Sequence, residues 1–314
     1  MKKIKIALLS GGLSEEREVS LNTGEKIFQA LNKKKYEIFR YDPKTDLKKF
    51  IEATLDKEFD LVFPALHGPY GEDGTLQGML EMLQVPYVFS GCLASALAMN
   101  KFKTKKIVEN FGVKVARDLV IQKDQEYDID RAMNYLRLPI VVKPVELGSS
   151  VGISIAKTKE ELKKGIKKAL KHGEVLLEEF IGGRELTVAI LGNRNPEALP
   201  VIEIKPKSSE WFDYKAKYEV GASEEICPAS ISEELKDKVQ EDALKAFRAI
   251  GCWDLARADF ICNEDDRLYF LEINTIPGMT ATSLAPQAAK EHGLEFPKFL
   301  DELVKLALER SKIK

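Results

Sequence analysis

Oxygen-bearing side chains gather on one predicted hairpin near the end of the chain. Two apolar runs in the segment 255–284 flank four residues that favour turns, and this pattern predicts two antiparallel strands. We expect the turn to be centred between Asp265 and Asp266. Side chains alternate along a strand, so residues that lie opposite each other share a face. The pairs that this register places on one face are Asp259 with Glu272 and Arg257 with Asn274.

The face that carries Asp259 and Glu272 has the composition of a magnesium site. Two carboxylates directly opposite each other repel, and one pKa rises unless a cation lies between them. Oxygen ligands suit Mg²⁺, which proteins commonly hold with one or two carboxylates and substrate phosphates. An ordinary solvated hairpin is the simpler alternative, and a register shift of one residue would remove the site. The other face is expected to be core, with Ala256, Ala258, Phe260, Leu271 and Ile273.

Composition excludes several classes of function. A length of 314 residues predicts about two domains, and three small ones also fit; 44% of hydrophobic residues is ample for a core. A net charge of −2 gives no general attraction to nucleic acid or anionic membrane, and no apolar run is long enough to span one. Four cysteines without CxxC spacing indicate neither a zinc site nor a disulfide framework. We expect a cytoplasmic protein with no nucleic-acid or membrane partner.

The first hundred residues alternate predicted strands and helices. Strands are expected at 4–9, 59–66 and 86–89, and helices at 16–31, 75–83 and about 93–106. This order predicts a parallel α/β sheet with its ligand site at the carboxyl ends of the strands. Glu16 and His67 both follow such ends. Each also has an ordinary interpretation, as an acid in a first helical turn and as a histidine satisfied by backbone groups.

The segment 101–186 contains a glycine-rich loop between two predicted strands. Strands are expected at 115–121, 140–143, 152–156 and 175–180, with a helix from 158 to about 172. In the loop that follows Lys143, glycines, serines and the lysine itself could bind phosphate. The sequence has no P-loop or dinucleotide motif, so the loop is equally consistent with a simple turn. Lys101 belongs to a lysine-rich stretch that in isolation resembles a solvated helix face.

The segment 187–314 is expected to hold the hairpin, a long loop and a closing helix. Strands are expected at 187–191 and 199–205, and helices at about 233–250 and 296–309. The stretch 208–229 has polar and aromatic residues without periodicity, which is typical of a functional lid. The segment 277–283 leads to a helix start, where free N–H groups can receive a carboxylate.

Six segments resemble the ATP-grasp superfamily and, within it, the D-alanine–D-alanine ligase family. They are SGGLSEEREVSL, ALHGPYGEDGTLQGMLE, VVKPVELGSSVG, ELTVAILG, FDYKAKY and RADFI…FLEINTIPGMTATSL, in the family's order along nearly the whole chain. The resemblance implies an α/β fold of three domains, 1–100, 101–186 and 187–314, with ATP between the second and third. It also implies a homodimer.

The resemblance assigns nucleotide and metal roles to individual residues. Asp259, Glu272 and Asn274 would bind two Mg²⁺ (or Mn²⁺) ions at the phosphates of ATP. Lys101 and Lys143 would bind phosphate, with the loop 148–152 as a flap. The residues that it places at adenine and ribose are Glu178, Glu179, Ile181 and Glu185. Relatives commonly have lysine where this chain has Glu179, at a contact made largely by backbone.

The reaction that the resemblance implies has two steps. The γ-phosphoryl group passes from ATP to the carboxylate of one D-alanine, and the amine of a second D-alanine then displaces phosphate. This chemistry needs cations at the phosphoryl oxygens and donors at the oxyanion. The resemblance implies that Arg257 and the Gly278 N–H are the oxyanion donors. It places Glu16 and His67 at the first substrate, and Lys217, Ser283 and Leu284 at the second. It also places Ser149 and Tyr218 with Glu16 in a hydrogen-bonded network that closes the lid.

Two alternatives remain beside this assignment. The chain could be a related ligase that joins D-alanine to D-lactate or to another amino acid. It could also be an ATP-binding protein without turnover, which the complete set of metal ligands, Arg257 and both lysines disfavours. Tyr218 favours the dipeptide over the ester, because some relatives that make the D-lactate ester have phenylalanine there.

Overall fold

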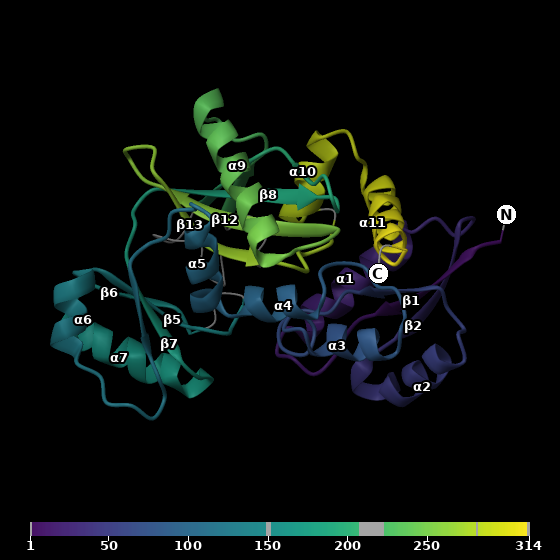
Figure 1. Ribbon diagram of the computed structural model, residues 1–314, viewed down its shortest axis with the longest axis horizontal. Helices are drawn as coiled ribbons and strands as arrows, with labels where there is room; N and C mark the ends of the chain where they lie inside the picture. The colour runs from purple at the N-terminus through teal and green to yellow at the C-terminus, as the bar shows by residue number, and fades with distance from the viewer. Residues whose placement is uncertain (1, 149–151, 207–222, 281, 313–314) are drawn as a thin grey trace.

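The computed structural model describes residues 2–148, 152–206, 223–280 and 282–312, and three sheets organise them (Figure 1). The first sheet is parallel, in the order β2–β1–β3, with β1 (Ile4–Leu9), β2 (Tyr36–Tyr41) and β3 (Leu61–Pro64). From residue 6 to residue 9, β1 is continuously apolar because both of its faces are covered. Ile6 and Leu8 belong to one core cluster, whereas Ala7 and Leu9 belong to another. The predicted parallel α/β sheet is confirmed.

Helices from both ends of the chain cover this first sheet. One face packs against α1 (Arg17–Ala30) and the last helix, α11 (Phe296–Arg310). The other face packs against α2 (Pro43–Leu55) and α3 (Thr75–Met82). Figure 1 shows the yellow C-terminal helix beside the purple N-terminal elements. The C-terminal segment is therefore part of the support for the N-terminal sheet.

The second sheet has six strands and carries the hairpin. Its order is β11 (Ser223–Ile226), β10 (Ile202–Pro206), β8 (Arg184–Leu191), β12 (Leu255–Cys262) and β13 (Leu268–Asn274), with β9 (Glu197–Ala198) on β8. One face packs against α4 (Cys92–Met99), α5 (Lys101–Asn110) and α9 (Glu233–Ile250). The other face packs against α10 (Leu284–Glu291).

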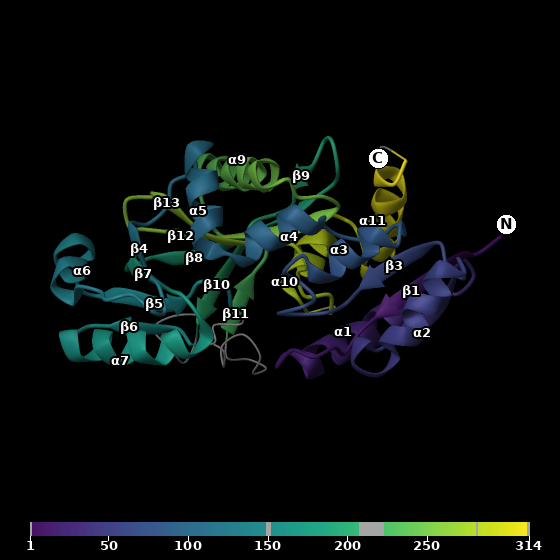
Figure 2. The ribbon, with the colours of Figure 1, turned by 60° about the horizontal axis from the view of Figure 1, so that its bottom comes forward.

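The third sheet is antiparallel and has its own core. Its order is β4 (Asp118–Ile121), β7 (Val175–Glu179), β5 (Ile140–Pro144) and β6 (Ser154–Ala156). The helices α6 (Ile129–Leu136) and α7 (Lys159–Ala169) pack on it, and η1 (Leu170–His172) follows α7. Figure 2 shows α6 and α7 at one end of the molecule, with α1 and α2 near the other.

The hairpin has the predicted strand pairing at Arg257 and Asp259. The pairing nearer the loop differs from the prediction. Asp259 pairs with Glu272, and Arg257 pairs with Asn274, as expected. The loop is centred on Asp265, since Cys262 pairs with Leu268. An irregularity between Asp259 and Phe260 then shifts the strand pairing, and this shift restores the predicted pairs at Asp259 and Arg257. As a consequence, Phe270 and not Leu271 lies opposite Phe260 in the core, so the prediction for Leu271 was wrong.

Three other predictions need correction, and some elements were not predicted at all. The expected strand 86–89 makes only an isolated bridge to β3. The single helix expected at 93–106 is two helices, because Asn100 leaves helical geometry and caps α5 through a hydrogen bond from the Lys103 N–H. The elements β2, α2 and α6 were not predicted, although Asp42 before a proline is a helix-start signal. Residues 223–226 form β11, so the irregular stretch expected at 208–229 was wrong there; 207–222 lie outside the described residues.

No helix among the described residues combines the length and hydropathy that a membrane crossing requires.

Candidate active site

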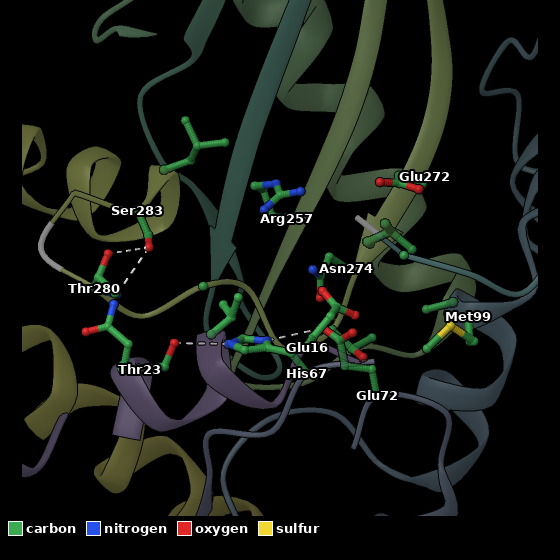
Figure 3. Close-up of a pocket in the computed structure, with 18 of the residues that line it drawn as sticks. Glu16, Thr23, His67, Glu72, Met99, Arg257, Glu272, Asn274, Thr280 and Ser283 are labelled. Carbon is green, nitrogen blue, oxygen red and sulfur yellow. Dashed lines mark hydrogen bonds and ion pairs between the residues drawn. The ribbon is translucent and has the colours of Figure 1, made fainter. Parts of the chain in front are cut away.

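A cavity of about 620 Å³ lies where the first sheet, the α4–α5 junction and the hairpin meet (Figure 3). Its walls come from segments far apart in sequence. The lining includes nine residues to which the resemblance gives a role: Glu16, His67, Lys101, Arg257, Glu272, Asn274, Gly278, Ser283 and Leu284. The structure thus brings together residues from both ends of the chain, which no local pattern in the sequence required.

Arg257 and Asp259 form a fixed pair on β12. Arg257 donates from Nε to Oδ1 at 2.9 Å and from its second terminal nitrogen to Oδ2 at 2.7 Å. The Thr187 hydroxyl donates to the same Oδ1 at 2.5 Å. Although burial alone would lower the pKa of Arg257, the Asp259 carboxylate raises it overall. The guanidinium is therefore a permanent cation held against the sheet, and it lines the cavity.

The predicted metal ligands fit a site that shares its ion with phosphate. Asp259 and Glu272 are direct cross-strand partners, and Asn274 follows on the same face. No three His, Cys, Asp or Glu side chains cluster as a metal site within the described ranges. Two carboxylates and an amide are too few for a closed cage, but they suit Mg²⁺, which commonly retains phosphate oxygens and water as ligands. The donor set therefore matches Mg²⁺ at a nucleotide.

Lys101 joins the start of α5 to both the hairpin and the glycine-rich loop. Its ammonium lies 3.2 Å from the Glu272 carboxylate and donates to the Leu147 carbonyl at 2.7 Å. Its backbone N–H donates to the Val145 carbonyl at 3.1 Å. Asn100 adds a bond of 2.6 Å from its side-chain amide to Glu146. The sequence interpretation of Lys101 as a solvated surface residue is wrong, because the side chain is buried.

Lys143 lies in a buried cluster of opposite charges between strands of the third sheet and α5. Glu178 forms ion pairs with both Lys143 and Lys105, and Lys105 also contacts Asp118 at 2.8 Å. Burial would raise the pKa of Glu178, but the two ammonium groups lower it to about 2. Burial lowers the pKa of Lys143 despite Glu178, whereas Glu178 and Asp118 raise that of Lys105 against the effect of burial. The pKa shifts of Lys105 and Glu178 therefore both favour the charged form.

The other residues expected at the nucleotide follow Glu178 along the chain. Glu179, at the end of β7, forms a two-bond ion pair with Arg117, at 2.9 and 3.0 Å. Ile181 lies between β7 and β8, and Glu185 lies on β8 opposite Ile204 and Ile261. None of Lys143, Glu178, Glu179, Ile181 and Glu185 lines the described cavity. These residues therefore lie outside the cavity, although Glu185 is on the strand that pairs with β12 of the hairpin.

The N-terminal wall of the cavity combines Glu16 with a buried histidine. The His67 ring lies 3.1 Å from the Thr23 hydroxyl through Nε2 and 3.8 Å from Glu72 through Nδ1. A side chain at position 68 would meet Glu16 at 2.6 Å, and Gly68 also has φ of 72°. Glycine is needed there because only it tolerates both conditions. In Figure 3, Glu16, His67 and Glu72 lie side by side below Asn274.

An ion pair outside the cavity holds the loop that precedes Glu16. Arg17 donates to both oxygens of Asp42 and to the Gly12 carbonyl. Asp42 also accepts the Gly12 N–H at 2.9 Å. Burial would raise the pKa of Asp42, but these donors, with Arg17 first among them, lower it to about 2. The loop therefore has a fixed shape at the point where Glu16 enters the cavity.

Ser283 lies at the start of α10, where it caps a tight turn. Its hydroxyl accepts the Thr280 N–H at 3.1 Å and lies 2.8 Å from the Thr280 hydroxyl. A side chain at Gly278 would lie 3.0 Å from the same hydroxyl, which explains the small residue at this position. In the view of Figure 3, Arg257 lies between Ser283 and Glu272. The cavity thus has a hydroxyl wall on one side of the guanidinium and an acidic wall on the other.

Three expected site residues, Ser149, Lys217 and Tyr218, lie outside the described residues. The sequence interpretation also missed several polar residues of the site. These are Thr23, Glu72, Lys105, Asp118 and Glu225. Glu72 lies in a segment that resembles the family, so it could have been considered. Lys105 and Asp118 gave no such signal, because each becomes significant only when folding buries it beside Glu178.

Two family models match the chain. "D-ala D-ala ligase C-terminus" matches residues 107–305, and "D-ala D-ala ligase N-terminus" matches residues 40–92. A D-alanine–D-alanine ligase from Desulfotalea psychrophila is 48% identical over 99% of this chain and 97% of its own.

Solved structures show the same likeness. A D-alanine–D-alanine ligase from Bacillus anthracis, complexed with ATP, superposes with a TM-score of 0.87 at 32% identity, covering 99% of both chains. A D-Ala:D-Ser ligase from Enterococcus faecalis superposes with a TM-score of 0.82 at 32% identity, covering 98% of this chain and 100% of that one. The fold is therefore shared by ligases that differ in their second substrate.

Proposed function

Because the chain belongs to the D-alanine–D-alanine ligase family, it joins two D-alanine molecules in a reaction driven by ATP, and we propose that the cavity residues described above carry this reaction. The product serves peptidoglycan precursor synthesis. One observation carries the proposal. The same cavity is lined by Glu16 and His67 from the N-terminal region and by Arg257, Gly278 and Ser283 from the C-terminal region.

We assign the first D-alanine to the wall formed by Glu16 and His67. The Glu16 carboxylate offers a partner for the substrate ammonium group. The imidazole of His67, held by Thr23 and facing Glu72, lies near the substrate carboxylate. The ion pair of Arg17 with Asp42 supports this assignment, because it fixes the loop that delivers Glu16. This wall would therefore orient the carboxylate that receives the phosphoryl group.

We assign the phosphates of ATP to Lys101, Lys143 and the hairpin face. Asp259, Glu272 and Asn274 would hold the two Mg²⁺ ions, which neutralise phosphate charge when bound. Lys101 already contacts Glu272, so a phosphate that enters beside it meets a cation in place. Lys143 is held by Glu178 at the end of β5. Glu178, Glu179, Ile181 and Glu185 would line the base and ribose.

We assign the oxyanion and the second D-alanine to the opposite wall. The Arg257 guanidinium and the Gly278 N–H would donate to the tetrahedral oxyanion. The amine, after losing a proton, forms the C–N bond while the C–O bond to phosphate breaks. Ser283 would donate to the second carboxylate at the start of α10, with Leu284 and Lys217 beside it. Ser149 and Tyr218 would complete the site with Glu16.

The experiment that tests this assignment measures ADP and dipeptide together. Wild-type protein with ATP, Mg²⁺ and D-alanine is expected to form one dipeptide per ADP. Arg257→Met should lower kcat by about 100-fold or more, the usual cost of one oxyanion donor. Arg267→Met serves as the matched control, since Arg267 is exposed at the hairpin turn. Equal activity of the Arg257 variant and wild type would contradict the proposal.

We also propose that the chain works as a cytoplasmic homodimer and that 1–100, 101–186 and 187–314 are its three domains. Light scattering coupled to size-exclusion chromatography tests the first of these, and limited proteolysis followed by mass spectrometry tests the domain limits. A monomeric mass would contradict the dimer, and cleavage confined to sites inside the three segments would contradict the division.

A further inference from the structure

Glu225 places a carboxylate on the cavity wall. It lies on β11 and pairs with Ile204, a member of the core cluster beneath α10. Residues opposite each other on neighbouring strands share a face, so Glu225 points to the α10 side of the sheet. Leu255, two residues before Arg257, belongs to the same cluster, which places Arg257 on that side too. Both residues line the cavity.

The Glu225 carboxylate is fastened to the start of α10. Gln287 donates from its side-chain amide to Glu225 Oε2, and also to the Thr282 carbonyl at 2.7 Å. Gln287 is bonded in turn to Ser283 through its backbone N–H, at 3.0 Å. The Glu225 carboxylate is thus held in a fixed position beside the start of α10.

The surroundings give Glu225 a distinct electrostatic effect. Among the described residues, five carboxylates line the cavity, Glu16, Glu18, Glu72, Glu225 and Glu272, with two permanent cations, Lys101 and Arg257. Glu225 is the carboxylate tied to the segment that starts α10, beside Ser283. Burial raises its pKa, whereas Gln287 and Arg257 act in the opposite direction. A ligand at Ser283 therefore lies close to the Glu225 carboxylate, which also interacts with the Arg257 guanidinium.

We propose that Glu225 is a specificity-determining residue that selects a second substrate carrying an ammonium group over an anion that lacks one. The inference rests on the proposed function, because it takes Ser283 as the site of the second substrate. D-alanine arrives as a zwitterion of net charge zero, whereas D-lactate arrives with a charge of −1. A fixed carboxylate at this place repels the carboxylate of either substrate, and only the ammonium group of D-alanine offsets that repulsion. One unit charge at a few ångströms in a half-buried site corresponds to about tenfold or more in relative affinity.

The test compares Glu225→Gln with Glu224→Gln. Glu224 is exposed, and because side chains alternate along β11 it points away from the cavity. Each protein receives ATP, Mg²⁺, D-alanine and an excess of D-lactate at about pH 8, and mass spectrometry measures dipeptide and ester. We expect Glu225→Gln to raise the ratio of ester to dipeptide by about tenfold, while the KM for ATP stays the same. Glu224→Gln should keep the wild-type ratio.

A third variant separates charge from structure. Glu225→Asp retains the negative charge and should keep the product ratio of wild type, even if its melting temperature falls. An unchanged ratio in Glu225→Gln would overturn the inference while leaving the ligase assignment intact. The same increase in Glu225→Asp would also overturn it, because shape and not charge would then set the ratio. Absence of both products from wild-type protein would instead contradict the proposed function itself.

Discussion

Lys101 and Glu272 form an ion pair, with 3.2 Å between Nζ and Oε2, that ties the start of α5 to the hairpin. Lys101 is expected to bind phosphate, and Glu272 is expected to bind magnesium. In the structure each of these two side chains has the other as its partner of opposite charge. A buried ammonium without such a partner would be costly. The pair therefore holds both side chains in place, and substrate binding exchanges one set of ionic contacts for another.

Glu272→Gln is expected to leave the fold intact and to remove most ligase turnover. The amide keeps the size of the side chain but takes one negative charge from the metal face and from Lys101. Activity at saturating Mg²⁺ and the melting temperature would be measured together. Asp265→Asn is the matched control, because Asp265 lies exposed at the centre of the hairpin loop. Near-normal turnover of Glu272→Gln would contradict the assignment of Glu272 as a metal ligand.

Lys105→Met is expected to destabilise the protein by about 3–5 kcal/mol, the usual cost of breaking a buried ion pair from one side. Glu178 and Asp118 would both lose a buried cation. Since Glu178 also holds Lys143, the KM for ATP should rise as well. Denaturant unfolding and ATP titration give the two values. Lys103→Met, at an exposed position of the same helix, should change neither; similar effects in both variants would refute a specific role for Lys105.

The stability contributed by Glu178 is expected to depend on pH in a defined direction. Its pKa is lowered from about 4.5 when unfolded to about 2 in the fold, so the folded state favours the ionised form. The contribution is fully present above about pH 4.5 and is lost as pH falls towards 2. The difference in unfolding free energy between wild type and Glu178→Gln should therefore narrow over that interval. A difference that stays constant from pH 6 to pH 3 would contradict this.

Asp42→Asn is expected to weaken binding of the first D-alanine without changing the KM for ATP. Asp42 accepts hydrogen bonds from Arg17 and from Gly12, and these fix the loop before Glu16. A neutral amide cannot form the two-bond ion pair, so Glu16 loses its fixed position. Steady-state kinetics at varied D-alanine separate the two substrate sites. Asp56→Asn, exposed at the end of α2, is the control, and an equal change in both KM values would contradict a local effect.

Local patterns in the sequence were sufficient for the hairpin and for the alternation of strands and helices, because both depend on short-range periodicity. The pairing of Asp259 with Glu272 was predicted from the expected position of the turn. The loop is in fact centred at a slightly different position, and the irregularity near Leu271 compensates for that difference. The same patterns misjudged Lys101, which looks solvated in its own helix. Its burial depends on Glu272 and on the loop at Leu147, far along the chain.

Residues whose role arises from tertiary contacts could not be predicted from local pattern. Lys105 becomes significant only beside Glu178, 73 residues away. Glu225 enters the cavity because β11 extends the sheet next to α10, in a stretch that the sequence presented as irregular. In both cases the chemistry depends on a neighbour that only the fold supplies.

The most direct test of the account follows an oxygen atom. D-alanine labelled with ¹⁸O in its carboxylate is incubated with the protein, ATP and Mg²⁺, and mass spectrometry examines the phosphate released. If the carboxylate attacks the γ-phosphoryl group and the second amine then displaces phosphate, one ¹⁸O atom per turnover must appear in the phosphate, with one dipeptide formed. Unlabelled phosphate, or ADP formed at the same rate without D-alanine, would contradict the account.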